Sequence, residues 1–465
     1  MPNGSPFLFL HFAYFVQQSE YICSMIRRIY LILMVCFTLI QCNKNEPKRI
    51  LLSSDILSQC NLSIQNAIVL DRVSAPAGAR RYMYACIAAY EALVPFYPDY
   101  QSVSGQFNKL GNLPKVDTSK SYCLDLAAMV AYTTVAKAVV YREDSIEGFR
   151  NRKLAYYKSA LGSEMYNNSM AWGDSLGKAI IKWAKKDTFD QIRGVDLYLA
   201  KTNDEFWQPT PTEYMQAVEP QWKKLRTVFI SNSSAFRDTL PLPAPYQLGK
   251  NKKFLEYQNQ VYTTSKNLDS NKIRIAKYWD DNPNSTFHYG HATINVLKVS
   301  PAGHWLGMFS TVARQKKYSL MESAEGMLRL SSAMHDAFIA CWEAKYHFEY
   351  VRPVTSIRKT IDSSWLPLIE TPAFPEYPSG HSVVSSAAAT VLTNLFGEVS
   401  YTDSAEFQFG LGTRKFKNFR EASNEACISR LYGGIHYIEA IENGKKLGNA
   451  IGNYHNKKLI TRRKQ

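Results

Sequence analysis

The stretch EYPSGHSVVSSAAATVLTNLFGE, residues 376–398, places a serine, a glycine and a histidine at the expected start of a helix. Ser379 is a favoured N-cap residue, and Gly380 has no side chain to keep a ligand away from the backbone. The unpaired N–H groups of a first helical turn, at the positive end of the helix dipole, bind anions. The small residues Ala387 to Ala389 continue the helix, and Gly397 is a typical helix stop. Taken alone, the stretch predicts only a capped helix that carries one histidine.

The rest of the chain favours an all-α fold. Its 465 residues are 46% hydrophobic, which is enough for one large domain or two ordinary ones. Strand-like alternation is scarce, and the stretch 205–250 reads as irregular. Apolar residues recur at helical spacing in residues 72–96, 120–142, 165–186, 252–268, 320–347, 381–396 and 430–452. We therefore expect one or more helical bundles.

The N-terminal part resembles a bacterial lipoprotein signal. After Met25, a better start than Met1, two arginines precede the apolar residues 29–40, a run too short for an ordinary membrane span. Cys42 then stands where such a signal carries the lipid. The expected parts are a signal segment, a tether, an N-terminal helical part and a C-terminal helical catalytic part, over residues 1–41, 42–70, 71–240 and 241–465. This organisation implies a membrane-anchored protein of the bacterial cell envelope.

Charge and cysteine content exclude several other classes. The net charge is +15, but lysine and arginine are spread along the chain and no nucleic-acid-binding signature is present, so we expect no nucleic-acid partner. None of the eight cysteines forms a CxxC pair, which disfavours zinc and thioredoxin-like sites.

A second stretch, WEAKYHFEYVRP at residues 342–353, carries two cations seven positions apart. Seven residues of an α-helix turn by about 700°, which is about 20° less than two full turns. On one helix, Lys345 and Arg352 would therefore share a face. Pro353 would then end that helix. The same pattern is also compatible with a solvated basic face.

A third stretch, SRLYGGIHY at residues 429–437, carries Arg430 and His436. On an ideal helix these two side chains would point about 120° apart. The intervening Gly433 and Gly434 predict a bend that could bring them together.

The three stretches in this order resemble the superfamily of type-2 phosphatidic-acid phosphatases, bacterial acid phosphatases and vanadium-dependent haloperoxidases. The resemblance implies a helical fold around one tetrahedral oxyanion. The implied cationic cradle is Lys345, Arg352 and Arg430, with hydrogen-bond donors from Ser379 and Gly380. His381 would act as the acid/base. His436 would be the phosphatase nucleophile or the axial vanadium ligand of a haloperoxidase. Weaker likeness to haloperoxidases extends to Arg80 and to Gly303-His304-Trp305.

One position departs from the superfamily pattern. Members often carry an aspartate four residues after the last histidine, to orient its ring, and here that position is Ala440. The support of His436 is therefore open, with Asp336 or Glu439 as candidate replacements.

Three functions follow from the resemblance. A haloperoxidase, which would oxidise halide with hydrogen peroxide at bound vanadate, is favoured by the chain length and by Trp342 and Phe374, which resemble positions on the halide side of the pocket. A phosphatase would hydrolyse a phosphate ester through a phosphohistidine, without a cofactor. Ala440 favours the third, an oxyanion-binding surface lipoprotein with weakened catalysis. Related enzymes are often oligomers, so the resemblance leaves self-association open.

Overall fold

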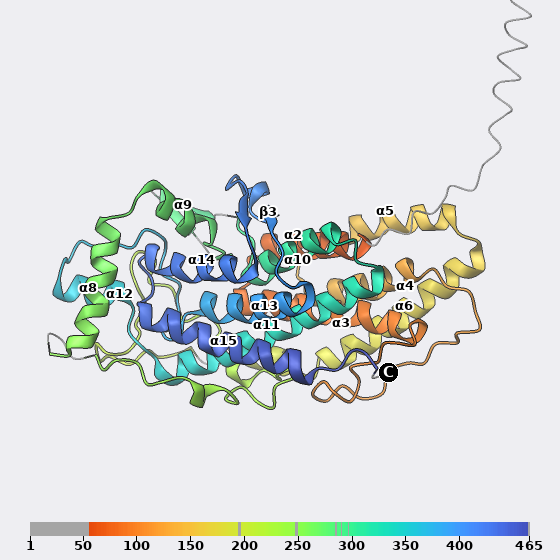
Figure 1. Ribbon diagram of the computed structural model, residues 1–465, viewed down its shortest axis with the longest axis horizontal. Coiled ribbons are helices and arrows are strands. Elements are labelled where there is room, and N and C mark those ends of the chain that lie inside the picture. Colours follow the sequence, from red (N-terminus) through yellow and green to blue (C-terminus); the bar gives the residue numbers. More distant parts are fainter. Residues whose placement is uncertain are drawn as a thin grey trace, which may run out of the picture. The chain divides into compact units, whose positions relative to one another are not determined.

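The computed structural model describes residues 55–193, 197–246, 250–283, 286–289, 291–295 and 297–463, and its main elements are labelled in Figure 1. The expected all-α fold is confirmed, with two small antiparallel sheets added to the helices. Strand β1 (Thr286–Tyr289) pairs with β2 (Ala292–Asn295), and β3 (Tyr401–Asp403) pairs with β4 (Arg414–Phe416). Residues 52–465 form one compact unit, which contains both of the expected helical parts.

The α-helices of the described chain, in order, are α2 (Ile56–Asp71), α3 (Ala75–Leu93), α4 (Leu124–Val139), α5 (Asp144–Ala160), α6 (Ser163–Ala184), α7 (Phe189–Ile192), α8 (Lys252–Lys266), α9 (Ser270–Tyr278), α10 (Pro301–Gln315), α11 (Leu320–Phe348), α12 (Pro353–Thr360), α13 (Gly380–Phe396), α14 (Phe419–Tyr432) and α15 (Ile438–Lys458). Short 3-10 turns lie at Val94–Phe96, Trp222–Lys224, Arg237–Thr239 and Phe407–Phe409. The described residues of the stretch 205–250 are irregular, as expected, apart from two of these 3-10 turns.

The expected tether is wrong over residues 56–70, because these residues form most of α2. Leu57, Ile64 and Ile68 recur at helical spacing and are fully buried, and the helix packs against α4, α5 and α10. Residues 1–54, including the expected signal segment and Cys42, lie outside the described residues. Among the described helices, none combines the length and apolar character that crossing a bilayer requires.

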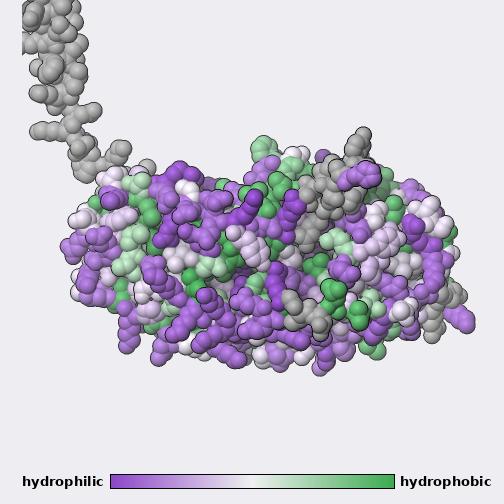
Figure 2. All heavy atoms as spheres, turned by 180° about the vertical axis from the view of Figure 1, so that it is seen from behind, coloured by the Kyte–Doolittle hydropathy of each residue, from purple (hydrophilic) through white to green (hydrophobic). Residues whose placement is uncertain are grey.

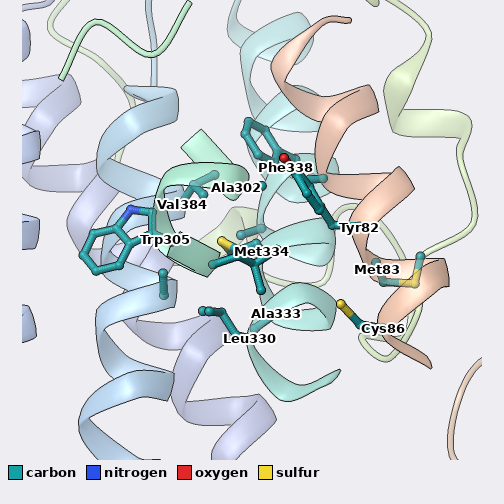
Figure 3. Packing of buried hydrophobic residues seen from close by; sticks show 14 of the residues in the cluster. Tyr82, Met83, Cys86, Ala302, Trp305, Leu330, Ala333, Met334, Phe338 and Val384 are labelled. Carbon is teal, nitrogen blue, oxygen red and sulfur yellow. The ribbon is translucent and has the colours of Figure 1, made fainter. Parts of the chain in front are cut away.

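Helix α11 is the longest helix of the described chain, and nearly every side chain on it is buried. Its start is fixed by a capping box between Ser319 and Glu322. It packs against α3, α10, α13 and α15. Figure 3 shows the core at this contact, where Met334 and Phe338 of α11 lie near Tyr82 of α3 and Trp305 of α10. The last turn of α11 is thereby held rigidly at one end of this core.

Helices α13 and α15 approach each other closely through a stripe of glycines. Gly444, Gly448 and Gly452 recur every four residues on α15 and face α13. A Cβ atom at Gly448 would lie 2.1 Å from the backbone oxygen of Val383, so no larger residue fits there. This packing fixes the start of α13, which carries Ser379 and His381, against the segment that follows His436.

The surface is mixed in character. Figure 2 shows hydrophilic residues over much of one face, with hydrophobic residues scattered among them. The five cysteines of the described chain are buried and unpaired, as is usual for cysteines that act as small core residues.

Candidate functional site

The residues of the three stretches come together at the ends of helices. Lys345 lies in the last turn of α11 and Arg430 in the last turn of α14. Arg352 and Ser379 are the N-cap residues of α12 and α13. His436 lies in the loop between α14 and α15. The loops and caps, rather than one helical face, therefore shape the site.

The expectation that Lys345 and Arg352 share one helix is wrong. Glu349 has a left-handed backbone, with φ of 49°, and ends α11. Pro353 occupies the first turn of α12, where its missing N–H costs nothing, so it begins a helix instead of ending one. The two cations still converge, because the Lys345 Nζ and the Arg352 guanidinium carbon each lie 5.0 Å from the centre of the Phe374 ring.

The bend expected between Arg430 and His436 is present. Helix α14 ends at Tyr432, and Gly434 has φ of +78°, in the left-handed region that glycine tolerates. The N–H of Ile435 donates to the carbonyl of Arg430 over 3.2 Å, which closes the turn. The chain then reverses and presents His436.

The three cations of the cradle are at most 1% exposed. Lys345 Nζ donates to the carbonyls of Pro375 and Glu376, over 2.7 and 3.0 Å. Arg430 donates to the Ser429 hydroxyl and to the carbonyl of Trp279. Among the described residues, these side-chain donors reach no carboxylate within ion-pair distance.

Arg352 organises the back of the cradle through its own donors. It donates to the carbonyls of Phe374, Ile435 and Pro372, over 2.9, 2.8 and 3.3 Å. Its Nη1 atom also lies 3.2 Å from Nε2 of His436.

Burial makes the positive charges costly. It lowers the pKa of Lys345 to about 7 and that of Arg352 to about 10, and it also lowers the pKa of Arg430. Buried cations that lack a carboxylate partner are stabilised by a bound anion.

The support of His436 comes from Glu376, which the sequence interpretation did not single out. Nδ1 of His436 lies 2.9 Å from Oε1 of Glu376, and the same oxygen accepts from the N–H of Tyr437 over 2.9 Å. Because Arg352 donates to Nε2, the ring proton sits on Nδ1 and a lone pair stays on Nε2. Glu376 is in the stretch quoted first, as a fully buried acid between two prolines.

This pair is neutral in the anion-free protein. Burial raises the pKa of Glu376 to about 8, against the opposing effect of Arg352 and Lys345. Burial, together with the nearby cations, holds the pKa of His436 well below its ordinary value. The contact is therefore a hydrogen bond between uncharged groups.

The two carboxylates suggested to replace the missing aspartate have other partners. Asp336 accepts from three backbone N–H groups of residues 228–230 and contacts His455. Glu439 accepts from the N–H of Ala244 and lies near Lys253. Since Glu376 fills the role, Ala440 gives no reason to expect weakened catalysis.

The neutral wall of the site is the start of α13, as expected. Ser379 Oγ accepts from the N–H and the hydroxyl of Ser382, over 3.4 and 3.0 Å, which leaves its own hydroxyl proton for another acceptor. A Cβ at Gly380 would point at Trp342 and the end of Lys345, so it would narrow the cradle.

His381 is the most accessible of the two site histidines, with 17% of its side chain exposed. Its Nε2 atom has no hydrogen-bond partner among the described residues and lies 3.9 Å from Oδ2 of Asp281. Burial, followed by the charges of Arg430 and His304, holds the pKa of His381 well below its ordinary value.

A cavity of about 700 Å³, open solvent included, lies above these groups. Trp342 and Phe374, with ring centres 4.9 Å apart, form an aromatic side of it. His381 and His436 also line it. The cavity thus joins an apolar wall to the two site histidines.

The residues present fit a tetrahedral oxyanion such as vanadate or phosphate. Arginine and lysine donors, a helix start and an uncommitted His381 nitrogen are the groups that such an anion requires. The fold and the site therefore define a helical protein with a buried cluster of cations whose donors suit an oxyanion.

Comparison with known proteins assigns the family. A family model described as the VCPO second helical-bundle domain matches residues 326–463. The structure described as the first bacterial vanadium-dependent iodoperoxidase is 34% identical, with a TM-score of 0.84, over 90% of this chain and 100% of that chain. The chain belongs to the vanadium haloperoxidase superfamily.

More distant structures share the fold. The apo and holo forms of a bacterial vanadium-dependent chloroperoxidase are each 17% identical, with TM-scores of 0.62 and 0.61. The matches cover 82% and 83% of this chain, and 92% of that chain in each case. No curated protein matches the chain.

Proposed function

We propose that this protein is a vanadium-dependent haloperoxidase, which oxidises a halide with hydrogen peroxide. The observation that carries the proposal is a set of three buried cations. Within the described chain, their hydrogen bonds go to carbonyls, a hydroxyl and the His436 ring instead of carboxylates. Such a set stabilises a highly charged anion in a site shielded from water. The iodoperoxidase similarity favours vanadate as that anion and iodide as the first halide to test.

In this proposal the chain's own groups divide the work. When bound, vanadate would supply Lewis-acid activation of hydrogen peroxide without a change of its own oxidation state. Lys345, Arg352 and Arg430 would hold its oxygens. The hydroxyl of Ser379 and the N–H of Gly380 would donate to it from the neutral wall.

The two histidines would have different tasks. His436 offers the Nε2 lone pair as the protein ligand, since Glu376 holds the proton on Nδ1. His381, which lines the cavity, would hold or release a proton at Nε2, an atom that has no hydrogen-bond partner among the described residues. Trp342 and Phe374 would keep water from the halide side.

A phosphatase is the second candidate, and the neutral state of His436 favours it. A neutral histidine that carries no proton on Nε2 is the form that attacks a phosphoryl group. In that case His381 would protonate the leaving alcohol.

The test is to reconstitute the purified protein with orthovanadate and to measure peroxide-dependent oxidation of iodide, then of bromide. Halide oxidation that requires vanadate supports the haloperoxidase function. If the protein oxidises no halide but hydrolyses an aryl phosphate, and vanadate inhibits that hydrolysis, the phosphatase function is supported instead.

We also propose that the protein is a lipoprotein of the bacterial cell envelope, with Cys42 as the lipidated residue. The support is the sequence pattern before Cys42. Labelling with a radioactive fatty acid should mark the wild type, and the proposal fails if Cys42→Ser is labelled equally.

A further inference from the structure

A second cluster of ionisable side chains lies behind His381. Its members are at most 2% exposed, and they are Asp281, His304, Asp403 and Glu406. They come from the segment after α9, from α10, from β3 and from the turn that follows β3. Since three separate segments of the chain meet here, the cluster is a specific feature of the fold.

His304 is held at both ring nitrogens. Nδ1 lies 3.0 and 3.1 Å from the two oxygens of Asp281, and Nε2 lies 2.8 Å from Oδ2 of Asp403. Ionised carboxylates only accept hydrogen bonds, so both nitrogens must carry protons and the ring is a cation. The two carboxylates outweigh burial and hold the pKa of His304 well above its ordinary value.

On the side away from His381, further hydrogen bonds hold Asp403 in place. Asp403 accepts from the hydroxyl of Tyr278 over 2.7 Å and from the N–H of Ala405 over 3.0 Å. The indole of Trp279 stacks on the His304 ring, with centres 4.6 Å apart and planes at 14°. The carbonyl of Trp279 in turn accepts from Arg430.

At the other side of the cluster, Asp281 lies close to His381 of the candidate functional site. Oδ2 of Asp281, whose carboxylate is bound by His304, lies 3.9 Å from Nε2 of His381. An isolated carboxylate at this distance would favour a protonated His381. The His304 cation opposes that effect.

We propose that His304 is a positioning residue for His381: clamped as a cation between Asp403 and Asp281, it fixes the Asp281 carboxylate opposite His381 and cancels its charge. His381 then stays neutral until an anion enters the cradle, and it gains its proton together with that anion. Only the use made of this proton rests on the proposed function.

The other charged groups that face His381 act in the same direction as His304. Arg430 and Lys345 also disfavour its protonated form, and burial is the largest cause. Burial, followed by the neighbouring Asp281, raises the pKa of Glu406 and so favours its uncharged form. His304 is thus the cation that stands directly against Asp281.

The first test is an NMR titration of the histidine rings in the vanadate-free, full-length protein. In the wild type, the nitrogen shifts of His304 should be those of a doubly protonated ring at pH 8. A neutral His304 ring at pH 8 would overturn the inference, and this arm needs no variant to fold.

The second test uses His304→Gln, which removes the positive charge of the His304 ring. The NMR signal of His381 is assigned as the one that disappears in His381→Gln. In His304→Gln, the titration midpoint of His381 should rise by about one pH unit, the size expected for one charged neighbour. Glu406→Gln, in the same cluster, and His455→Gln, which breaks the His455–Asp336 pair elsewhere, should leave it unchanged. A destabilised His304→Gln with an unmoved midpoint would show a structural role only. Because no vanadate is present, failure here is distinct from failure of the haloperoxidase assay.

Discussion

Nδ1 of His436 and Oε1 of Glu376 lie 2.9 Å apart, although the two residues are separated by 60 positions in the sequence. The contact fixes the proton on Nδ1 and leaves Nε2 for a ligand. The proposed chemistry depends on this arrangement.

Glu376→Ala removes the acceptor and should weaken vanadate binding by roughly 10- to 100-fold, the usual cost of losing such a partner. Glu376→Gln keeps an uncharged acceptor and should retain most of the affinity, since the native pair is neutral. Equilibrium titration with vanadate measures both. Glu439→Ala is the matched control, and equal losses in Glu439→Ala and Glu376→Ala would contradict the assigned role.

Lys345→Met should stabilise the anion-free protein most at low pH. Burial lowers the pKa of Lys345 to about 7 in the folded protein, against 10.5 for a solvent-exposed lysine of the unfolded chain, so the cost of burying its charge is complete below pH 7. That cost fades as the pH rises from about 7 to 10.5, because there the folded side chain is neutral while the unfolded one keeps its proton.

Thermal unfolding at pH 6.5 and 9.5 tests whether the stabilisation by Lys345→Met decreases as the pH rises. The gain in melting temperature from Lys345→Met should be larger at pH 6.5, and phosphate should stabilise the wild type more than the variant. A gain that grows with pH would contradict a buried lysine of depressed pKa.

Arg352→Lys should lower vanadate affinity by roughly 10- to 100-fold although it keeps the charge, since hydrogen bonds of charged groups contribute about 1.5 to 3 kcal/mol. The guanidinium reaches three carbonyls and His436 at once, which an ammonium cannot do. Arg358→Lys, on the following helix, serves as the control. An Arg352→Lys protein with wild-type affinity would show that charge alone matters.

Phe374→Ala should raise the KM for iodide more than it weakens vanadate binding. The ring covers both Lys345 and Arg352 at 5.0 Å and forms part of the aromatic side of the cavity. Its loss admits water, which weakens the interaction of a halide with these cations. Steady-state kinetics at saturating vanadate separates the two effects. An unchanged KM for iodide would contradict the proposed contact of Phe374 with the halide.

The sequence predicted the helical class and most long helices, because apolar spacing is a local signal. It missed α5, α10 and most of α14. It also missed α2, since polar Asn61 and Gln65 interrupt the apolar pattern although both are buried. It also placed Lys345 and Arg352 on one helix, because spacing alone does not reveal the left-handed Glu349 that ends α11.

The cradle residues could be identified from their motifs, whereas their partners could not. Glu376 and the His304 cluster depend on contacts between segments distant in the chain. The only local signal for Glu376 was a single acid in an otherwise uncharged stretch before Ser379.

The central claim is tested most directly by one measurement on wild type and His436→Ala: vanadate-dependent oxidation of iodide by hydrogen peroxide, with bound vanadium quantified in the same samples. The account predicts about one tightly bound vanadium and turnover in the wild type, and loss of turnover in His436→Ala. Wild-type protein that binds vanadate without oxidising iodide or bromide, or a His436→Ala variant with full turnover, would contradict it.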